Sequence, residues 1–206
     1  MTKEEGKNKV LDIDGNEYPT IQVANQLWMA ANLKVRHFSN GDPIPECRDT
    51  QDYVQAGLDG QPAWCFYDND SANGDKYGAL YNWYAAHDPR SIAPQGWRLP
   101  TERDWDVLWQ NIRADQDSQG LSFKAFEGAS PKSELAIFHP QHGGSRGING
   151  AFGGIKVNAY YWSYNHNPPE ISWGRRLAAG KSGLEKIDSF QRFGFSVRCI
   201  KDEASA

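Results

Sequence analysis

APQGWRLPTERDWDVL, residues 93–108, carries the strongest folding signal in the chain. Thr101 stands before a run that is acidic in its first turn, which is typical of a helix N-cap. Four apolar residues then follow the spacing i, i+3, i+4, i+7: Trp105, Leu108, Trp109 and Ile112. This spacing places them on one helix face, so we expect an amphipathic helix after Thr101 that packs on an apolar partner.

The segment before it shows the same spacing. In YGALYNWY, residues 77–84, one apolar stripe is formed by Tyr77, Leu80, Tyr81 and Tyr84. The pattern predicts a second amphipathic helix over this segment.

Strand signals lie on both sides of these two segments. At the start, Asp14-Gly15-Asn16 is a hairpin turn signal between apolar runs at 10–13 and 18–23, and a further short run covers 27–29. Past the glycine-rich residues 143–154, we expect strands at 159–164, 171–178, 183–187 and 193–200. The last alternates apolar and polar residues and is therefore predicted to be half-buried. Strands, then helices, then strands predict an α+β fold with a mainly antiparallel sheet.

Length and charge bound the class of protein. The 206 residues suit one domain, which we place at 10–202 between polar tails at 1–9 and 203–206. A net charge of −4 argues against nucleic acid as a partner, because binding phosphates needs a basic surface. No apolar run is long enough to span a membrane. The first nine residues do not form a signal peptide.

Metal and covalent chemistry have little support in the sequence. Cys47, Cys65 and Cys199 form no CxxC pair, which favours three buried thiols over one disulfide and a free thiol. The Asx-rich run at 68–75 departs from a calcium-binding EF-hand loop, so a surface turn is preferred to a looser calcium site. No nucleophile–base constellation is present either. We therefore expect no cofactor, no metal site and no enzymatic activity.

The stretch from Tyr160 to Phe193 mixes aromatic, asparagine and arginine residues, the composition of recognition surfaces. Trp162, Phe195 and Val197 are expected in the core. The residues predicted to face outward and bind a ligand are Tyr161, Asn165, His166, Asn167, Trp173, Arg175, Arg176, Asp188, Phe190 and Arg192, with Tyr160 and Tyr164 as weaker members.

Several motifs occur together in a fixed order: DIDGNEYPTIQVANQLWMAANLK, YGALYNWYAA, APQGWRLPTERDWDVL, GGSRGINGAFGG, YYWS and GFSVRCIKD. In this combination the chain resembles the Fibrobacter succinogenes major paralogous domain. GWRLPTERDW also resembles the formylglycine-generating enzymes and sulfatase-modifying factors. That resemblance implies a C-type-lectin-like fold, with two helices packed on a small sheet and irregular loops.

The resemblance implies two classes of function. Formylglycine-generating oxidases hold copper with a cysteine pair near the C-terminus, and here only Cys199 lies in that region, so this activity is disfavoured. C-type-lectin-like domains also serve as variable receptors of diversity-generating retroelements, whose diversified residues precede a fixed closing strand. The run before GFSVRCIKD resembles that layout. We therefore expect a receptor or adhesin that binds a protein or glycan at a bacterial surface, outside the cell or on a phage virion. An undiversified surface or exported protein of the same family is the alternative.

Overall fold

The helix expected after Thr101 is confirmed. In the computed structural model, which describes residues 9–119, 141–164, 171–178 and 183–202, it is α4, Glu102–Gln119. The Asp104 carboxylate accepts from the Thr101 backbone N–H (2.7 Å) and hydroxyl (2.7 Å), and the Asp104 N–H donates to Thr101 Oγ1 (3.3 Å). This reciprocal pairing satisfies groups that a helix N-terminus leaves without partners.

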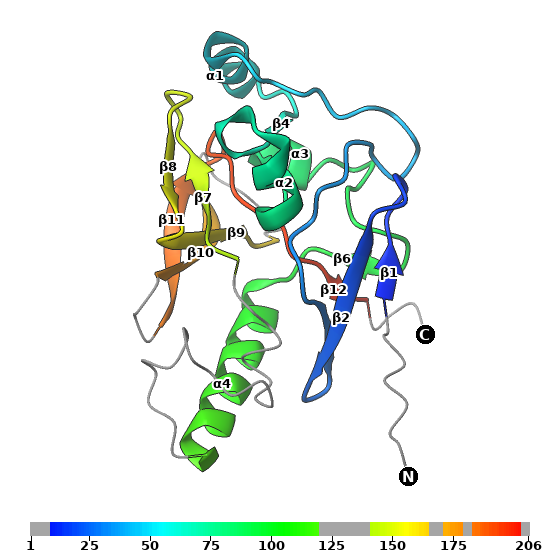
Figure 1. Ribbon diagram of the computed structural model, residues 1–206, viewed down its shortest axis with the longest axis vertical. Coiled ribbons are helices and arrows are strands. Elements are labelled where there is room, and N and C mark those ends of the chain that lie inside the picture. Colours follow the sequence, from blue (N-terminus) through cyan, green and yellow to red (C-terminus); the bar gives the residue numbers. More distant parts are fainter. Residues whose placement is uncertain (1–8, 120–140, 165–170, 179–182, 203–206) are drawn as a thin grey trace.

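Two five-stranded sheets flank α4 (Figure 1). The first has the order β1 (Lys9–Leu11), β2 (Glu17–Val23), β3 (Gln26–Met29), β12 (Ile200–Lys201) and β6 (Trp97–Arg98). The second has the order β11 (Leu184–Phe190), β10 (Ile171–Ala178), β9 (Asn158–Trp162), β7 (Gly143–Arg146) and β8 (Phe152–Ile155). Every strand pair of these sheets is antiparallel except β7 with β9.

The remaining elements lie above α4 in Figure 1. They are the pair β4 (Trp64–Cys65) and β5 (Leu80–Tyr81), the helices α1 (Thr50–Leu58), α2 (Ser71–Tyr77) and α3 (Trp83–Ala86), and a 3-10 turn at Tyr67–Asn69. The α+β class with mainly antiparallel pairing is thus confirmed. The expectation of two helices on one small sheet is wrong, since the described residues form four α-helices and three sheets.

The apolar stripe of α4 fills the space between the two large sheets. Trp105, Leu108 and Ile112 are buried there. The first sheet contributes Trp28, whose ring centroid lies 4.8 Å from that of Trp105. The second contributes Tyr161, at 5.3 Å from the same ring. α4 therefore joins the two sheets through one apolar cluster.

The helix predicted over residues 77–84 is wrong. α2 ends at Tyr77, and Gly78 follows with a positive φ of 77°. A Cβ on Gly78 would lie 2.6 Å from Asn32 Cβ, so only glycine fits this close approach. Leu80 and Tyr81 then pair as β5 with β4. Tyr77 is buried before this break, and Leu80 and Tyr81 are buried after it. Their spacing therefore does not mean that they share one helix face.

The two ends of the described chain meet in one sheet. Gly15, with φ 79°, turns the first hairpin, and Tyr18 and Glu17 begin the return strand opposite β1. Ile200 of β12 pairs with Trp28 on one side and Arg98 on the other.

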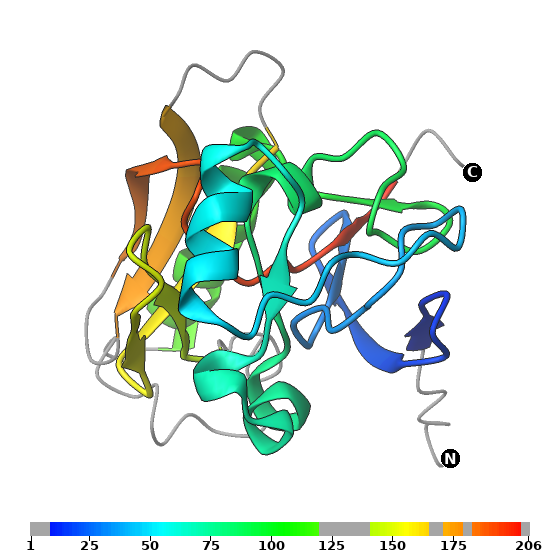
Figure 2. The ribbon, with the colours of Figure 1, turned by 90° about the horizontal axis from the view of Figure 1, so that it is seen from above.

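The half-buried strand predicted at 193–200 is also wrong. Only Ile200 belongs to a regular strand, and every residue from Gly194 to Ile200 is buried. The segment crosses the middle of the molecule, where it appears red in Figure 2. Its backbone bonds β5 at Phe195 and β9 at Ser196. Both sides of the segment are covered, so the alternation of residue types does not separate an exposed face.

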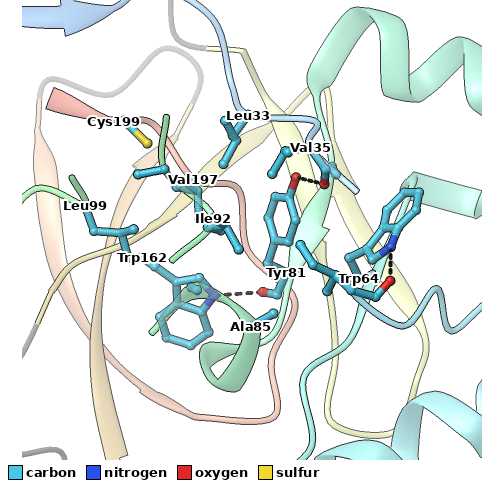
Figure 3. Packing of buried hydrophobic residues seen from close by; sticks show 14 of the residues in the cluster. Leu33, Val35, Trp64, Tyr81, Ala85, Ile92, Leu99, Trp162, Val197 and Cys199 are labelled. Carbon is cyan, nitrogen blue, oxygen red and sulfur yellow. Dashed lines mark hydrogen bonds between the residues drawn. The ribbon is translucent and has the colours of Figure 1, made fainter. Parts of the chain in front are cut away.

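Aromatic side chains with satisfied polar atoms build the main core (Figure 3). Trp162 Nε1 donates to the Tyr81 carbonyl (2.8 Å), and the Tyr81 hydroxyl donates to the Val35 carbonyl (2.7 Å). Trp64 Nε1 donates to the Ile44 carbonyl at 3.0 Å. Such bonds offset the cost of burying polar groups. The core positions predicted for Trp162, Phe195 and Val197 are confirmed.

All three cysteines are free and buried, which confirms the thiol interpretation over the disulfide. Burial raises the pKa of Cys65 to about 11 and that of Cys199 to about 12. The two lie in different apolar clusters. In the described part of the chain, no helix is long and apolar enough to cross a membrane.

Candidate ligand-binding groove

A groove of about 500 Å³ opens between the end of α3 and the start of α4. Its floor and walls come from segments distant in sequence: His87 and Asp88 follow α3, Trp97 and Arg98 form β6, and Tyr164 follows β9. The Tyr164 N–H donates to the Pro100 carbonyl at 2.8 Å, which fixes the chain after β9 beside the entrance to α4.

Three rings are stacked at one side of the groove. Trp83 and His87, one helical turn apart, stack with centroids 4.3 Å apart and planes at 13°. Tyr164 also stacks with His87, with centroids 5.6 Å apart and planes at 12°. Tyr164 is 39% exposed, so the stack ends in a tyrosine that reaches the surface. Aromatic pairs prefer such offset stacks, which contribute about 0.5–1.5 kcal/mol beyond the burial of their area.

His87 is held as a neutral ring. Its Nδ1 lies 3.2 Å from the Trp83 carbonyl and its Nε2 lies 3.2 Å from the Ser163 carbonyl. Burial disfavours the imidazolium more strongly than the two carbonyls favour it, so the pKa of His87 falls to about 4. A neutral imidazole carries one N–H and donates to only one of these carbonyls at a time. His87 therefore adds no charge to the groove at neutral pH.

The charged residues of the groove are paired within the protein. Asp88 binds Arg90 through two contacts of 2.8 Å, and these hydrogen bonds lower the pKa of Asp88. Arg98 binds both Asp104 oxygens, at 2.6 and 3.2 Å. The groove thus offers polar atoms without an unbalanced charge. Two of its hydroxyls are engaged as well, since Ser91 accepts from a backbone N–H and Thr101 caps α4.

Two of the predicted ligand-binding residues are not exposed. Tyr161 is 1% exposed and packs on α4. Arg175 is also buried, and its Nη2 donates to Asp106 Oδ1 (2.8 Å) and to the Glu102 carbonyl (3.2 Å). The expectation that these two face solvent is wrong, because α4 covers the sheet face to which they point.

Other candidates lie at separate places. Tyr160 stacks on Phe195 at 5.2 Å and is half-buried. Arg176, on the same face of the second sheet, binds Glu185 of β11. Phe190 and Arg192 line a second, smaller hollow of about 230 Å³ beside α1 and Tyr84. Asp188 is exposed on β11. The structure therefore distributes these candidates over both faces of the sheet.

Some predictions fall outside the described structure. Asn165, His166 and Asn167 lie outside the described residues, and so does the side chain of Trp173. Their roles stay predictions. Among the residues that are described, no group of three or more histidine, cysteine, aspartate or glutamate side chains is placed to hold a metal ion.

Sequence reasoning missed most of the groove. His87, Asp88, Trp97 and Arg98 were not candidates. One signal was available: Trp83 and His87 are spaced i, i+4, which places both rings on one face of a helical turn. Tyr164 approaches Trp83 and His87 only through the long connection that contains α4. No local pattern in the sequence predicts this approach.

These observations define an α+β domain in which segments distant in sequence form a groove, with stacked aromatic rings along one side. A family model, that of the Fibrobacter succinogenes major domain, matches residues 21–201, and the chain belongs to this family. No curated protein and no solved structure matches the chain. The C-type-lectin-like fold therefore stays a prediction.

Proposed function

We propose that this protein is a non-catalytic ligand-binding domain of C-type-lectin-like type, and that its ligand binds in the groove beside Tyr164. The observation that carries the proposal is the ring stack, which presents a stacked, partly exposed tyrosine next to a hollow of about 500 Å³. A hollow of this size suits a small ligand or one unit of a larger one.

The chemistry of the groove favours an uncharged ligand with one apolar face, and a neutral glycan fits this description best. Asp88 and Arg98 are each paired with an opposite charge. An ionic ligand would have to compete with those pairs, whereas hydroxyl groups can add hydrogen bonds to them. The Tyr164 ring supplies a flat apolar surface for the C–H groups of a sugar.

The side chains also support binding over catalysis. Both ring nitrogens of His87 face main-chain carbonyls rather than a nucleophile. The raised pKa values of Cys65 and Cys199 leave both thiols protonated at neutral pH, and a protonated thiol is a poor nucleophile and metal ligand. The two sulfurs also lie in separate clusters, which disfavours the copper site of a formylglycine-generating oxidase.

A glycan array followed by calorimetry on the strongest hit tests this proposal. We expect Tyr164→Ala to weaken binding at least tenfold and Tyr164→Phe, which keeps the ring, to bind nearly as well as the wild type. Leu58→Ala is the control, since Leu58 is an exposed apolar side chain beside the other hollow. Equal binding by Tyr164→Ala and the wild type would refute the groove as the site.

Binding should also be independent of calcium. A cation that binds only the folded state raises the melting temperature as its concentration rises. We expect calcium and a chelator to give the same melting temperature and the same affinity for the glycan. A calcium-dependent rise in either would contradict the proposal.

We further propose that the exposed positions of the late stretch, among them Tyr164, Asp188 and Phe190, are diversified by a retroelement. Surface substitutions cost little stability, so such positions tolerate variation. Tyr161 and Arg175 do not meet this condition, because both are buried. The test is the DNA downstream of the gene. A near-copy of this stretch that differs at adenines, beside a reverse-transcriptase gene, supports diversification, and its absence leaves an undiversified binding protein.

A further inference from the structure

The strand β11 ends the second sheet on one side. Leu184–Phe190 pairs with β10 over its whole length, and no other strand of the described residues pairs with it. Its outer backbone groups therefore face away from the sheet. A seven-residue edge of this kind is a template for another strand, and proteins control such pairing with charged side chains.

The side chains of β11 alternate in a self-complementary way. The Lys186–Glu102 ion pair of 2.7 Å places Lys186 on the α4 side of the sheet, and strand alternation assigns Leu184, Asp188 and Phe190 to the same face. Phe190 is 45% exposed, and Asp188 is exposed. Opposite charges at 186 and 188 stand on either side of Ile187, and apolar residues stand at both ends. When two copies of LEKIDSF are aligned antiparallel, residues of opposite charge and pairs of apolar residues therefore lie opposite each other.

We propose that β11 pairs antiparallel with β11 of a second copy of this chain, centred on Ile187, and forms a two-fold symmetric dimer with one continuous sheet. In this register Lys186 lies opposite the partner's Asp188, and the same pair occurs again by symmetry. Leu184 lies opposite the partner's Phe190, and Glu185 lies opposite the partner's Ser189. Opposite charges and apolar pairs directly across two strands both stabilise the pairing.

Neighbouring registers are disfavoured by charge. Centring the pair on Lys186 brings two lysines together, and centring it on Asp188 brings two aspartates together. Like charges directly opposite destabilise a strand pair. A register centred on Glu185 has the same fault. Among the registers centred on residues 185 to 188, charge therefore favours only the one centred on Ile187.

Sedimentation velocity over a concentration series measures this association. We expect the wild type to shift from one to two chain masses as its concentration rises. The association should weaken with salt, because the ion pairs lie at the edge of the sheet. Asp188→Lys should weaken it at least tenfold, since it places two lysines opposite each other twice. Asp75→Lys, an exposed aspartate on α2, is the matched control and should associate as the wild type does.

A mixing experiment separates this interface from loss of folding. Lys186→Glu alone also places like charges together, so each variant should be monomeric by itself. An equimolar mixture of Lys186→Glu and Asp188→Lys restores opposite charges at both pairs and should dimerise. Monomers in the mixture would overturn the proposal, as would a wild type that stays monomeric at every concentration.

Hydrogen exchange gives a readout that needs no variant. The amides of β11 should become more protected as the wild-type concentration rises, while those of β8, at the other end of the sheet, should not change. Protection of β11 that is independent of concentration would contradict the dimer.

Discussion

Neighbouring residues of the stretch from Tyr160 to Phe193 are of similar type but differ in whether the rest of the molecule covers them. Trp162, in β9, is fully buried, and Tyr164, two residues later, is 39% exposed at the groove. Arg175 is bound under α4, whereas Arg176 reaches the surface on the opposite face of the sheet. The exposure of each residue depends on what covers it. α4 lies on one face of the strands, and the buried segment around Phe195 packs on the other. A recognition-like composition therefore does not by itself identify a recognition surface.

The largest effect should come from a covered residue of the stretch. Trp162→Ala removes a buried ring that contacts Phe195 (4.5 Å) and donates to the Tyr81 carbonyl (2.8 Å). We expect a loss of about 3–5 kcal/mol in the free energy of unfolding, measured by urea denaturation. Tyr164→Ala, the matched surface variant, should cost less than about 1 kcal/mol. Similar losses for the two would mean that Tyr164 is as much part of the core as Trp162.

Because His87 is neutral in the folded protein, the stability of the protein should depend on pH. The pKa of His87 is about 4 in the folded protein against 6.5 for a free side chain. Between these values the unfolded chain binds the proton and the folded chain does not, so stability falls as the pH falls through this window. The loss should reach about 3 kcal/mol, at about 1.4 kcal/mol per pKa unit.

His87→Phe keeps a ring in the stack and removes the titration. Subtracting its urea-denaturation profile from that of the wild type isolates the histidine from the carboxylates that titrate nearby. A difference that is flat from pH 6.5 to pH 4 would show that His87 is accessible to protons in the folded state.

Arg175 and Arg176 are neighbours in β10 but lie on opposite faces of the sheet. Arg175→Met breaks a buried, charged hydrogen bond to Asp106 and should cost about 1.5–3 kcal/mol. Arg176→Met breaks an exposed pair with Glu185 and should cost about 0.2–1 kcal/mol. Thermal denaturation of both variants measures the order. The reverse order would contradict the assignment of α4 as the cover of this face.

Local signals predicted the fold better than they predicted the site. Thr101 and Asp104 lie within one turn, and their pairing at the start of α4 could be read from the sequence. The hairpin at Gly15 is equally local. The break at Gly78 could not be predicted, because it depends on the close approach of Asn32, which is distant in the sequence. The burial of the segment around Phe195 depends in the same way on two sheets that assemble around it.

The site was harder to predict for the same reason. Tyr164 was a weak candidate and His87 was not one, and their contact joins segments that are 76 or more residues apart. Alternation along β9 predicts that Tyr161 faces away from Trp162, and this is confirmed. It does not predict that α4 covers the face on which Tyr161 lies.

Nuclear magnetic resonance on the protein with the strongest neutral glycan ligand tests the central claim most directly. Ligand titration should shift the signals of the His87 ring, the Trp97 indole and the Tyr164 amide, because all three residues line the groove. The Phe190 and Arg192 amides beside the smaller hollow should not move. Shifts confined to Phe190 and Arg192, with His87 and Tyr164 unchanged, would contradict the groove as the ligand site.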